Sequence, residues 1–301
     1  MNKKTYVFKE KFMYNVIENN MHIIDLHTHT NYSDGELTPQ ELMAAAAKIG
    51  CELIAVTDHD TVAGIKEARE AAKRYGIKFI AGIEISTQEH EEVHILGLGV
   101  DENNELLQTK CREFRECREK RAQLICDFFA RRGIEILMDE IRRDAEGKVI
   151  ARPHFAGYLV KHGYVQSTKE AFERYLNTSD FHKEVIRVKP TPEEAIELIH
   201  QAGGKAVLAH PGQLKKNWED REYFIASLKR AGLDGVECYY DKHTPADTDK
   251  FLVLARKFRL GTSCGSDYHG IHVKPDVQLG MYYDSKHCPD VELIGSTFMN
   301  E

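Results

Sequence analysis

The sequence lacks any uninterrupted apolar run close to the ~18 residues that a membrane-spanning helix needs. It also lacks an excess of positive charge, because 41 Lys and Arg stand against 48 Asp and Glu and the formal net charge is -7 with histidine neutral. We therefore expect neither a membrane protein nor one that binds duplex nucleic acid through clustered basic residues. A small phosphorylated substrate held by metal ions is compatible with this charge.

The seven cysteines include no CxxC pair, and no motif of a nucleophilic Ser or Cys is present. Such an odd and scattered set, in a chain of 301 residues, is typical of reduced thiols in the cytoplasm. The first 20 residues contain early lysines but no apolar core and no small-residue cleavage site, so a secretory signal is not expected. We predict a cytoplasmic protein with an N-terminal extension over residues 1–21.

A repeated pattern is present instead, in which a helical segment ends at a glycine and a short, continuously apolar strand follows. Glycine ends a helix readily because it adopts the left-handed conformation without penalty, and strands that are apolar on both faces belong to parallel sheets covered by helices. Two further strand candidates lie at residues 21–27 and 92–100. These seven strands predict an α/β fold, a closed or nearly closed (β/α) barrel rather than an open doubly wound sheet. The five repeats are residues 46–60, 71–86, 200–212, 229–240 and 255–270.

Residues 101–189 interrupt the pattern. Apolar residues at helical spacing predict a long helix over 103–133, and a second helix is expected after a cap at Ser167 or Thr168. The barrel pattern resumes where Thr191 caps a helix and Pro192 takes its first position. We predict a barrel domain made of residues 22–100 and 190–301, with residues 101–189 as a helical insertion that covers the substrate.

Polar residues gather where the apolar strands end, which is the rim that carries the chemistry in barrel enzymes. His27 and His29 stand two positions apart on a strand, so both point the same way, about 7 Å apart, and can converge on one cation. This HxH pair is a weak signal alone, since histidine is often only partly buried. The evidence for a metal site becomes stronger when this pair is taken together with the other histidines and acids at the strand ends. The full set is His27, His29, Asp34, His59, Glu84, His94, His210, Asp267 and His269.

Six histidines and three carboxylates suit two or three cations, because one metal ion uses about four such ligands. Nitrogen and oxygen ligands without cysteine favour Mn, Zn or Fe over Mg or Ca. Glu84 lies inside an otherwise apolar strand, where an unpaired carboxylate is costly and a bound cation is a natural partner. The alternative is a set of unrelated structural histidines.

Six segments, "DLHTHTNYSDG", "AVTDHDT", "GIEIS", "HILGLG", "AHPG" and "GSDYHG", resemble in this order the motifs of the PHP (polymerase and histidinol phosphatase) superfamily of metal-dependent phosphoesterases. The resemblance covers residues 22–100 and about 190–270. It implies a distorted, TIM-like (β/α)7 barrel with a trinuclear metal centre. In that centre the first metal would be held by His27, His29, Glu84 and Asp267, the second by Asp34, His59 and His269, and the third by Glu84, His94 and His210.

One branch of this superfamily has histidine replaced by aspartate at the position of Asp34, which implies a more weakly held second metal. The same branch carries a helical insertion between the fourth and fifth strands with an RPH motif, which "IARPHFAGYLV" resembles. It includes phosphatases of nucleoside monophosphates and 3′,5′-bisphosphates and exonucleases for short RNA. The resemblance implies that Arg152 and His154 contact phosphate. Alternatively, Arg152 pairs with a surface acid and His154 caps the following helix.

Three further acids, Asp58, Asp60 and Glu237, stand beside predicted ligands or at a strand end and are predicted to orient ligating histidines.

We predict a metal-dependent phosphatase or phosphodiesterase that acts on a small nucleotide or short RNA, through a hydroxide that the metals activate. The alternatives are a histidinol-phosphate phosphatase, a non-catalytic module that kept the fold, and an amidohydrolase. Amidohydrolases also use HxH on a barrel, but commonly with a modified lysine at a strand end, and no such lysine is present.

Overall fold

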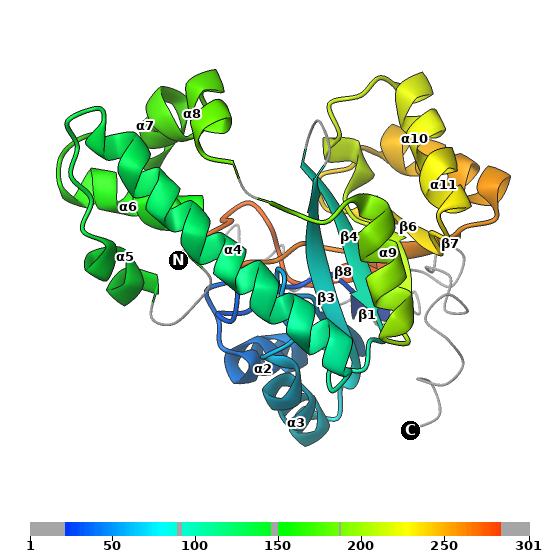
Figure 1. Cartoon of the computed structure of the whole chain (residues 1–301). Coiled ribbons are helices and arrows are strands. Elements are labelled where there is room, and N and C mark those ends of the chain that lie inside the picture. The colour runs from blue at the N-terminus through cyan, green and yellow to red at the C-terminus, as the bar shows by residue number, and fades with distance from the viewer. Residues whose placement is uncertain (1–21, 89–91, 146–149, 187, 284–301) are drawn as a thin grey trace, which may run out of the picture.

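The computed structural model describes residues 22–88, 92–145, 150–186 and 188–283, so the predicted extension at 1–21 lies outside the described residues. Within them, one sheet has the strand order β7-β6-β5-β4-β3-β2-β1-β8 (Figure 1). Its strands are β1 (His22–Asp25), β2 (Leu53–Val56), β3 (Lys78–Gln88), β4 (Glu92–Leu98), β5 (Lys205–Leu208), β6 (Gly235–Tyr240), β7 (Gly261–Gly265) and β8 (Met281–Tyr283).

The end strand β7 approaches β1, so that the sheet forms a nearly closed barrel. The Leu26 amide donates to the Cys264 carbonyl at 3.2 Å, and the His29 amide donates to the Tyr268 carbonyl at 2.9 Å. These bonds join the chain that leaves β1 to the chain that leaves β7. The predicted distorted, TIM-like barrel is confirmed.

Strand direction differs from the expected all-parallel arrangement. β4 is antiparallel to both β3 and β5, and β8, which was not predicted, is antiparallel to β1. The reason for the first difference is the short connection: only residues 89–91 separate β3 from β4, whereas a parallel neighbour needs a crossover of a dozen or more residues. An apolar run identifies a buried strand but does not encode its direction.

Five helices belong to the repeating units of the barrel, and their ends follow local sequence signals. Thr38 and Glu41 form a capping box at the start of the first of them, and Gly50 ends it in the left-handed conformation at φ 77°. Thr191 likewise caps a helix with Pro192 at its first position. The helices are α2 (Pro39–Ile49), α3 (Ile65–Tyr75), α9 (Pro192–Gln201), α10 (Trp218–Arg230) and α11 (Pro245–Phe258).

Between β4 and β5 the chain forms a group of helices beside the barrel (Figure 1). This group has its own hydrophobic cluster, in which Phe128, Phe129, Phe155 and Phe181 are fully buried. The long predicted helix is α4, which also packs against the barrel core. The group consists of α4 (Glu105–Ala130), α5 (Met138–Ala145), α6 (Arg152–Lys161), α7 (Thr168–Ala171), a π-helical turn (Phe172–Leu176) and α8 (Ser179–Glu184). Across the ranges that the structure describes, no helix combines the length and apolar character required to cross a membrane.

Candidate metal centre

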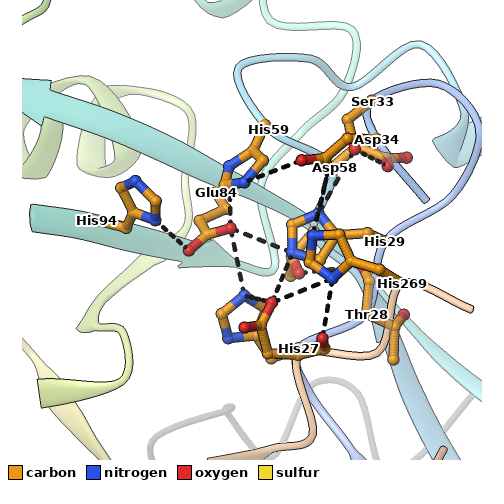
Figure 2. A network of polar contacts seen from close by, with 12 residues as sticks. His27, Thr28, His29, Ser33, Asp34, Asp58, His59, Glu84, His94 and His269 are labelled. Carbon is orange, nitrogen blue, oxygen red and sulfur yellow. Dashed lines mark hydrogen bonds and ion pairs between the residues drawn. The ribbon is translucent and has the colours of Figure 1, made fainter. Parts of the chain in front are cut away.

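Glu84, on β3, lies at the centre of the predicted ligands, with five imidazole rings around its carboxylate. Figure 2 shows the rings of His27, His29, His59 and His94 beside it. The side chain is fully buried. Glu84 Oε2 lies 3.3 Å from His27 Nε2, 3.1 Å from His29 Nε2 and 3.0 Å from His59 Nδ1. Glu84 Oε1 lies 2.8 Å from His94 Nδ1 and 3.0 Å from His210 Nε2. Residues from four separate strand ends thus meet at one carboxylate.

Two further carboxylates complete the cluster. Asp267 Oδ1 lies 3.4 Å from His29 Nε2 and 3.3 Å from His269 Nδ1. Asp34 Oδ1 lies 3.3 Å from His269 Nε2, and Asp34 Oδ2 lies 3.9 Å from His59 Nε2. The structure therefore brings all nine predicted ligands together.

Three overlapping groups have ligand atoms within 4.8 Å of one another and could each hold a metal ion. The first group has the composition that the family resemblance implied, and the second contains His29 in addition to the three implied residues. The third contains His59 where the resemblance implied His210, although His210 also contacts Glu84. The groups are His27–His29–Glu84–Asp267, His29–Asp34–His59–His269 and His59–Glu84–His94.

Buried ligand atoms without hydrogen-bond partners show that the cluster fits cations. Leaving a buried polar atom unsatisfied costs about 1–3 kcal/mol, so several at one point need a common partner. Imidazole nitrogens and carboxylate oxygens are suitable ligands for Mn, Zn or Fe. The atoms are His27 Nε2, His29 Nε2, His59 Nδ1, His94 Nε2, Asp34 Oδ1 and Glu84 Oε2.

The electrostatics of the cluster favour ionised carboxylates. Burial alone would raise the pKa of Glu84, but the His59, His27 and His94 rings hold it well below its usual range. Burial lowers the pKa of His94 to about 4, so this ring is neutral near pH 7. Burial opposes protonation of His29 as well, but Asp267 and Glu84 outweigh it and raise the pKa of His29 to about 9. Metal binding would displace the His29 proton.

Unusual backbone conformations also concentrate here. Asp60, His210 and Asp267 have positive φ angles of 58°, 29° and 59°, which are uncommon for residues other than glycine. Such strained conformations persist where the surrounding structure enforces them, and they are frequent at functional sites. Each of the three is a predicted ligand or the neighbour of one.

Glu237 makes the kind of contact that was predicted for it. Its Oε1 lies 3.0 Å from His27 Nδ1, and its Oε2 accepts a hydrogen bond of 2.6 Å from the His210 amide. A His27 Nδ1–H that donates to Glu237 leaves the Nε2 lone pair directed at Glu84 and Asp267. Glu237 therefore holds one predicted ligand ring and the backbone of another, and its role in metal binding stays a prediction.

In the described contacts, the side chains of Asp58 and Asp60 bind groups other than the histidines that they were predicted to orient. Asp58 accepts hydrogen bonds from the Thr30 amide at 2.7 Å and the Ser33 hydroxyl at 2.6 Å, which fixes the loop after β1. Asp60 pairs with Arg118 of α4. Both acids support the chain that carries a predicted ligand.

Several residues of this region were not predicted from the sequence. Asp25 is fully buried on β1, accepts hydrogen bonds from the Ser266 hydroxyl at 2.6 Å and the Gly280 amide at 2.8 Å, and burial raises its pKa to about 6. Its signal, an acid inside an apolar strand, is the one that marked Glu84. Lys274 Nζ and Tyr240 Oη donate to Asp267 Oδ2 at 2.7 and 3.1 Å. No sequence pattern indicates the Lys274 contact.

Arg152 and His154 lie in the helical group, at the start of α6. The His154 Nδ1 accepts a hydrogen bond of 3.0 Å from the Ala151 amide, as in the helix-capping alternative. Arg152 donates to Asn177 Oδ1 at 3.0 Å. Contact of these two side chains with phosphate stays a prediction.

The chain belongs to the PHP domain family, whose family model matches residues 25–259. It is 38% identical over 255 residues to the 5′-3′ exoribonuclease Rnm of Escherichia coli strain K12, covering 82% of this chain and 85% of that protein. It is 37% identical over 248 residues to the 3′,5′-nucleoside bisphosphate phosphatase of Chromobacterium violaceum, covering 82% and 87%.

A solved structure from Chromobacterium violaceum, described as an amidohydrolase with bound SO4 and no metal, superposes with a TM-score of 0.77. It has 36% sequence identity and covers 87% of this chain and 91% of that one. The predicted family is thus confirmed. The chain is a hydrolase of phosphate ester bonds, as its family and the two relatives named for such reactions define it.

Proposed function

We propose that this protein hydrolyses phosphate esters of small nucleotides, with nucleoside 3′,5′-bisphosphates and short RNA as the substrate classes. The observation that carries the proposal is the convergence of five imidazoles on the buried Glu84, with unsatisfied ligand atoms directed at one another. The relatives that are named as an exoribonuclease and a bisphosphate phosphatase support the substrate class.

The nine clustered residues would hold two or three divalent ions, with Mn, Zn or Fe favoured by the donor atoms. Bound there, the ions would supply a water of lowered pKa and would neutralise charge on the phosphoryl oxygens. Glu84 would join the groups, because it belongs to two of them and contacts His210 as well. Glu237 would keep His27 Nε2 free for a metal by accepting the proton of Nδ1.

Residues 101–189 would form the unit that receives the substrate. Arg152 and His154 would contact the phosphate, since a guanidinium matches the geometry of phosphate oxygens. Their position in the first turn of α6 supports this role, because the amino end of a helix favours anions.

The inferred cytoplasmic location is supported by the six described cysteines, which are all thiols.

The description of one structural neighbour as an amidohydrolase favours a second candidate function. Against it stands the composition of the described cluster, in which no lysine belongs to the three candidate metal groups, whereas amidohydrolases commonly use a modified lysine. A histidinol-phosphate phosphatase would use the same metal cluster.

The test is a hydrolysis screen of the full chain with added Mn²⁺. The substrates are nucleoside 5′-monophosphates, 3′,5′-bisphosphates, short RNA, histidinol phosphate and a set of amides. We expect phosphate or nucleotide release to be fastest from a 3′,5′-bisphosphate or from short RNA, and to be lost in His27→Ala and His59→Ala. The control is His22→Ala, because His22 lies in a partly exposed pair with Glu52. Faster turnover of amides, or full activity in both ligand variants, would contradict the proposal.

A further inference from the structure

Helix α4 takes part in two of the hydrophobic clusters that the described residues form, the larger barrel cluster and the cluster of the helical group. Its first half contributes Leu107, Cys111 and Phe114 to the barrel core. Its second half contributes Ala122, Ile125 and other residues to the cluster of the helical group. The helix therefore connects the two parts physically, as Figure 1 shows.

Arg118 stands where the two halves meet. It follows Phe114 and precedes Ala122 at helical spacing, so it continues the buried face, and only 8% of it is exposed. A buried guanidinium is costly unless it is paired and hydrogen-bonded. An apolar residue would satisfy packing at this position, so the charge needs a specific explanation.

The partner of Arg118 is Asp60, which lies in the loop after β2. Arg118 Nε donates to Asp60 Oδ2 at 3.0 Å, and Nη2 donates to the same oxygen. The other oxygen, Asp60 Oδ1, accepts a hydrogen bond of 2.9 Å from the Ser86 amide of β3. Asp60 thus connects α4 to the strand that carries Glu84.

Asp60 immediately follows His59, a member of two of the three candidate metal groups. Its positive φ of 58° turns the chain at this point, and its amide donates to the Glu84 carbonyl at 2.9 Å. His59 Nδ1 in turn lies 3.0 Å from Glu84 Oε2. The position of the His59 ring therefore depends on a loop whose acidic side chain is held by α4.

We propose that Arg118 is a positioning residue. Through Asp60, it makes the position of His59 at the metal centre depend on how α4 packs against the barrel. The inference rests on the proposed function, since it assumes that the cluster binds metal. Loss of Arg118 weakens cation binding selectively, in the two groups that contain His59. The group formed by His27, His29, Glu84 and Asp267 keeps its affinity.

The test is isothermal titration of Mn²⁺ into the metal-stripped full chain, together with thermal unfolding. Contacts that orient a metal ligand are typically worth about 10–100-fold in affinity. We expect Arg118→Met to lower the affinity for part of the bound Mn²⁺ equivalents about tenfold and to leave at least one equivalent unchanged. Arg118→Lys should not restore it, because an ammonium cannot replace the two-nitrogen contact. The matched control is Arg115→Met, since Arg115 lies on the exposed face of the same helix.

The double variant Asp60→Asn/Arg118→Met separates positioning from simple charge compensation. It removes the uncompensated buried carboxylate, so we expect the thermal stability of the fold to recover while binding of the Mn²⁺ equivalents that Arg118→Met weakens stays impaired. Wild-type affinity in Arg118→Met, or full recovery of affinity in the double variant, would overturn the inference. If Arg118→Met does not fold, the double variant decides. A wild-type chain that binds no Mn²⁺ would instead refute the proposed function on which the inference rests.

Discussion

At the scale of single residues, Glu84 shows how a buried charge can be both tolerated and useful. It is surrounded by apolar residues of its own strand, and its ionised form is stabilised by the rings of His59 and His27. Removing one partner of such a buried charged network is strongly destabilising, because the others lose their compensation. The same arrangement places imidazole and carboxylate lone pairs where cations would satisfy them.

The variant Glu84→Gln tests this account. It keeps the shape of the side chain but removes the charge and one ligand oxygen. We expect the rate of hydrolysis to fall by more than about 100-fold, which exceeds the loss typical of residues that only hydrogen-bond to a metal ligand. Phosphate release from the best substrate of the screen measures it. Glu52→Gln is the control, because the Glu52 side chain is exposed and pairs with His22 outside the cluster. Activity of Glu84→Gln within tenfold of wild type would contradict the prediction.

At the scale of elements, the approach of β7 to β1 builds the site, and Gly265 makes that approach possible. A Cβ atom at this position would lie 2.2 Å from His27 Cβ and 2.6 Å from Glu237 Oε1. Both distances are shorter than real contacts allow, so the two strands could not keep their spacing. His27 and Glu237 can contact each other only because residue 265 of β7 has no side chain.

We expect Gly265→Ala to lower the free energy of unfolding by about 1–3 kcal/mol, the usual cost of overpacking a core, and to weaken Mn²⁺ binding as His27 shifts. Chemical denaturation and titration calorimetry measure the two effects. Gly157→Ala is the matched control: its Cβ would meet nothing within 4 Å, and it lies inside α6, where alanine is favoured by about 0.5–1 kcal/mol. A Gly265→Ala protein as stable and as tight-binding as wild type would refute the packing argument.

At the scale of the whole molecule, metal binding, protonation and folding are linked. In the metal-free protein His29 has a raised pKa of about 9, so its contribution to stability is fully present below about pH 6.5 and is lost as the pH rises through about 9. Metal binding requires the neutral ring and therefore works in the opposite direction. Saturating metal adds stability, about 2.7 kcal/mol at a concentration of 100 times Kd.

We therefore expect Mn²⁺ affinity to increase as the pH rises toward about 9, with release of protons on binding. Calorimetry in two buffers of different ionisation enthalpy counts the protons released. Thermal unfolding with Mn²⁺ or with a chelator should show a higher Tm with the metal, by a margin that grows with pH. An affinity that does not change with pH, or a Tm unaffected by chelation, would exclude this linkage.

Much of the barrel and the ligand set could be predicted because the signals are local. Glycine after a helix, an apolar run and a polar residue at its end can each be read within about a dozen positions, and so His29, Glu84 and Asp267 were predicted as neighbours in space. The direction of β4 and the pairing of β8 could not be predicted this way, because strand direction depends on chain reversal and on partners elsewhere in the sheet.

The sequence by itself determined which residue types stand at the strand ends, and with them the fold class and the kind of ligand atoms. Only the tertiary structure decided which side chains from distant elements meet: that His59, His94 and His210 all contact Glu84, that Lys274 reaches Asp267, and that Arg118 reaches Asp60 across 58 positions. The physical reason is that a ligand group is defined by distances of a few ångströms between side chains from different elements. These distances are set by how strands and helices pack, which no local pattern records.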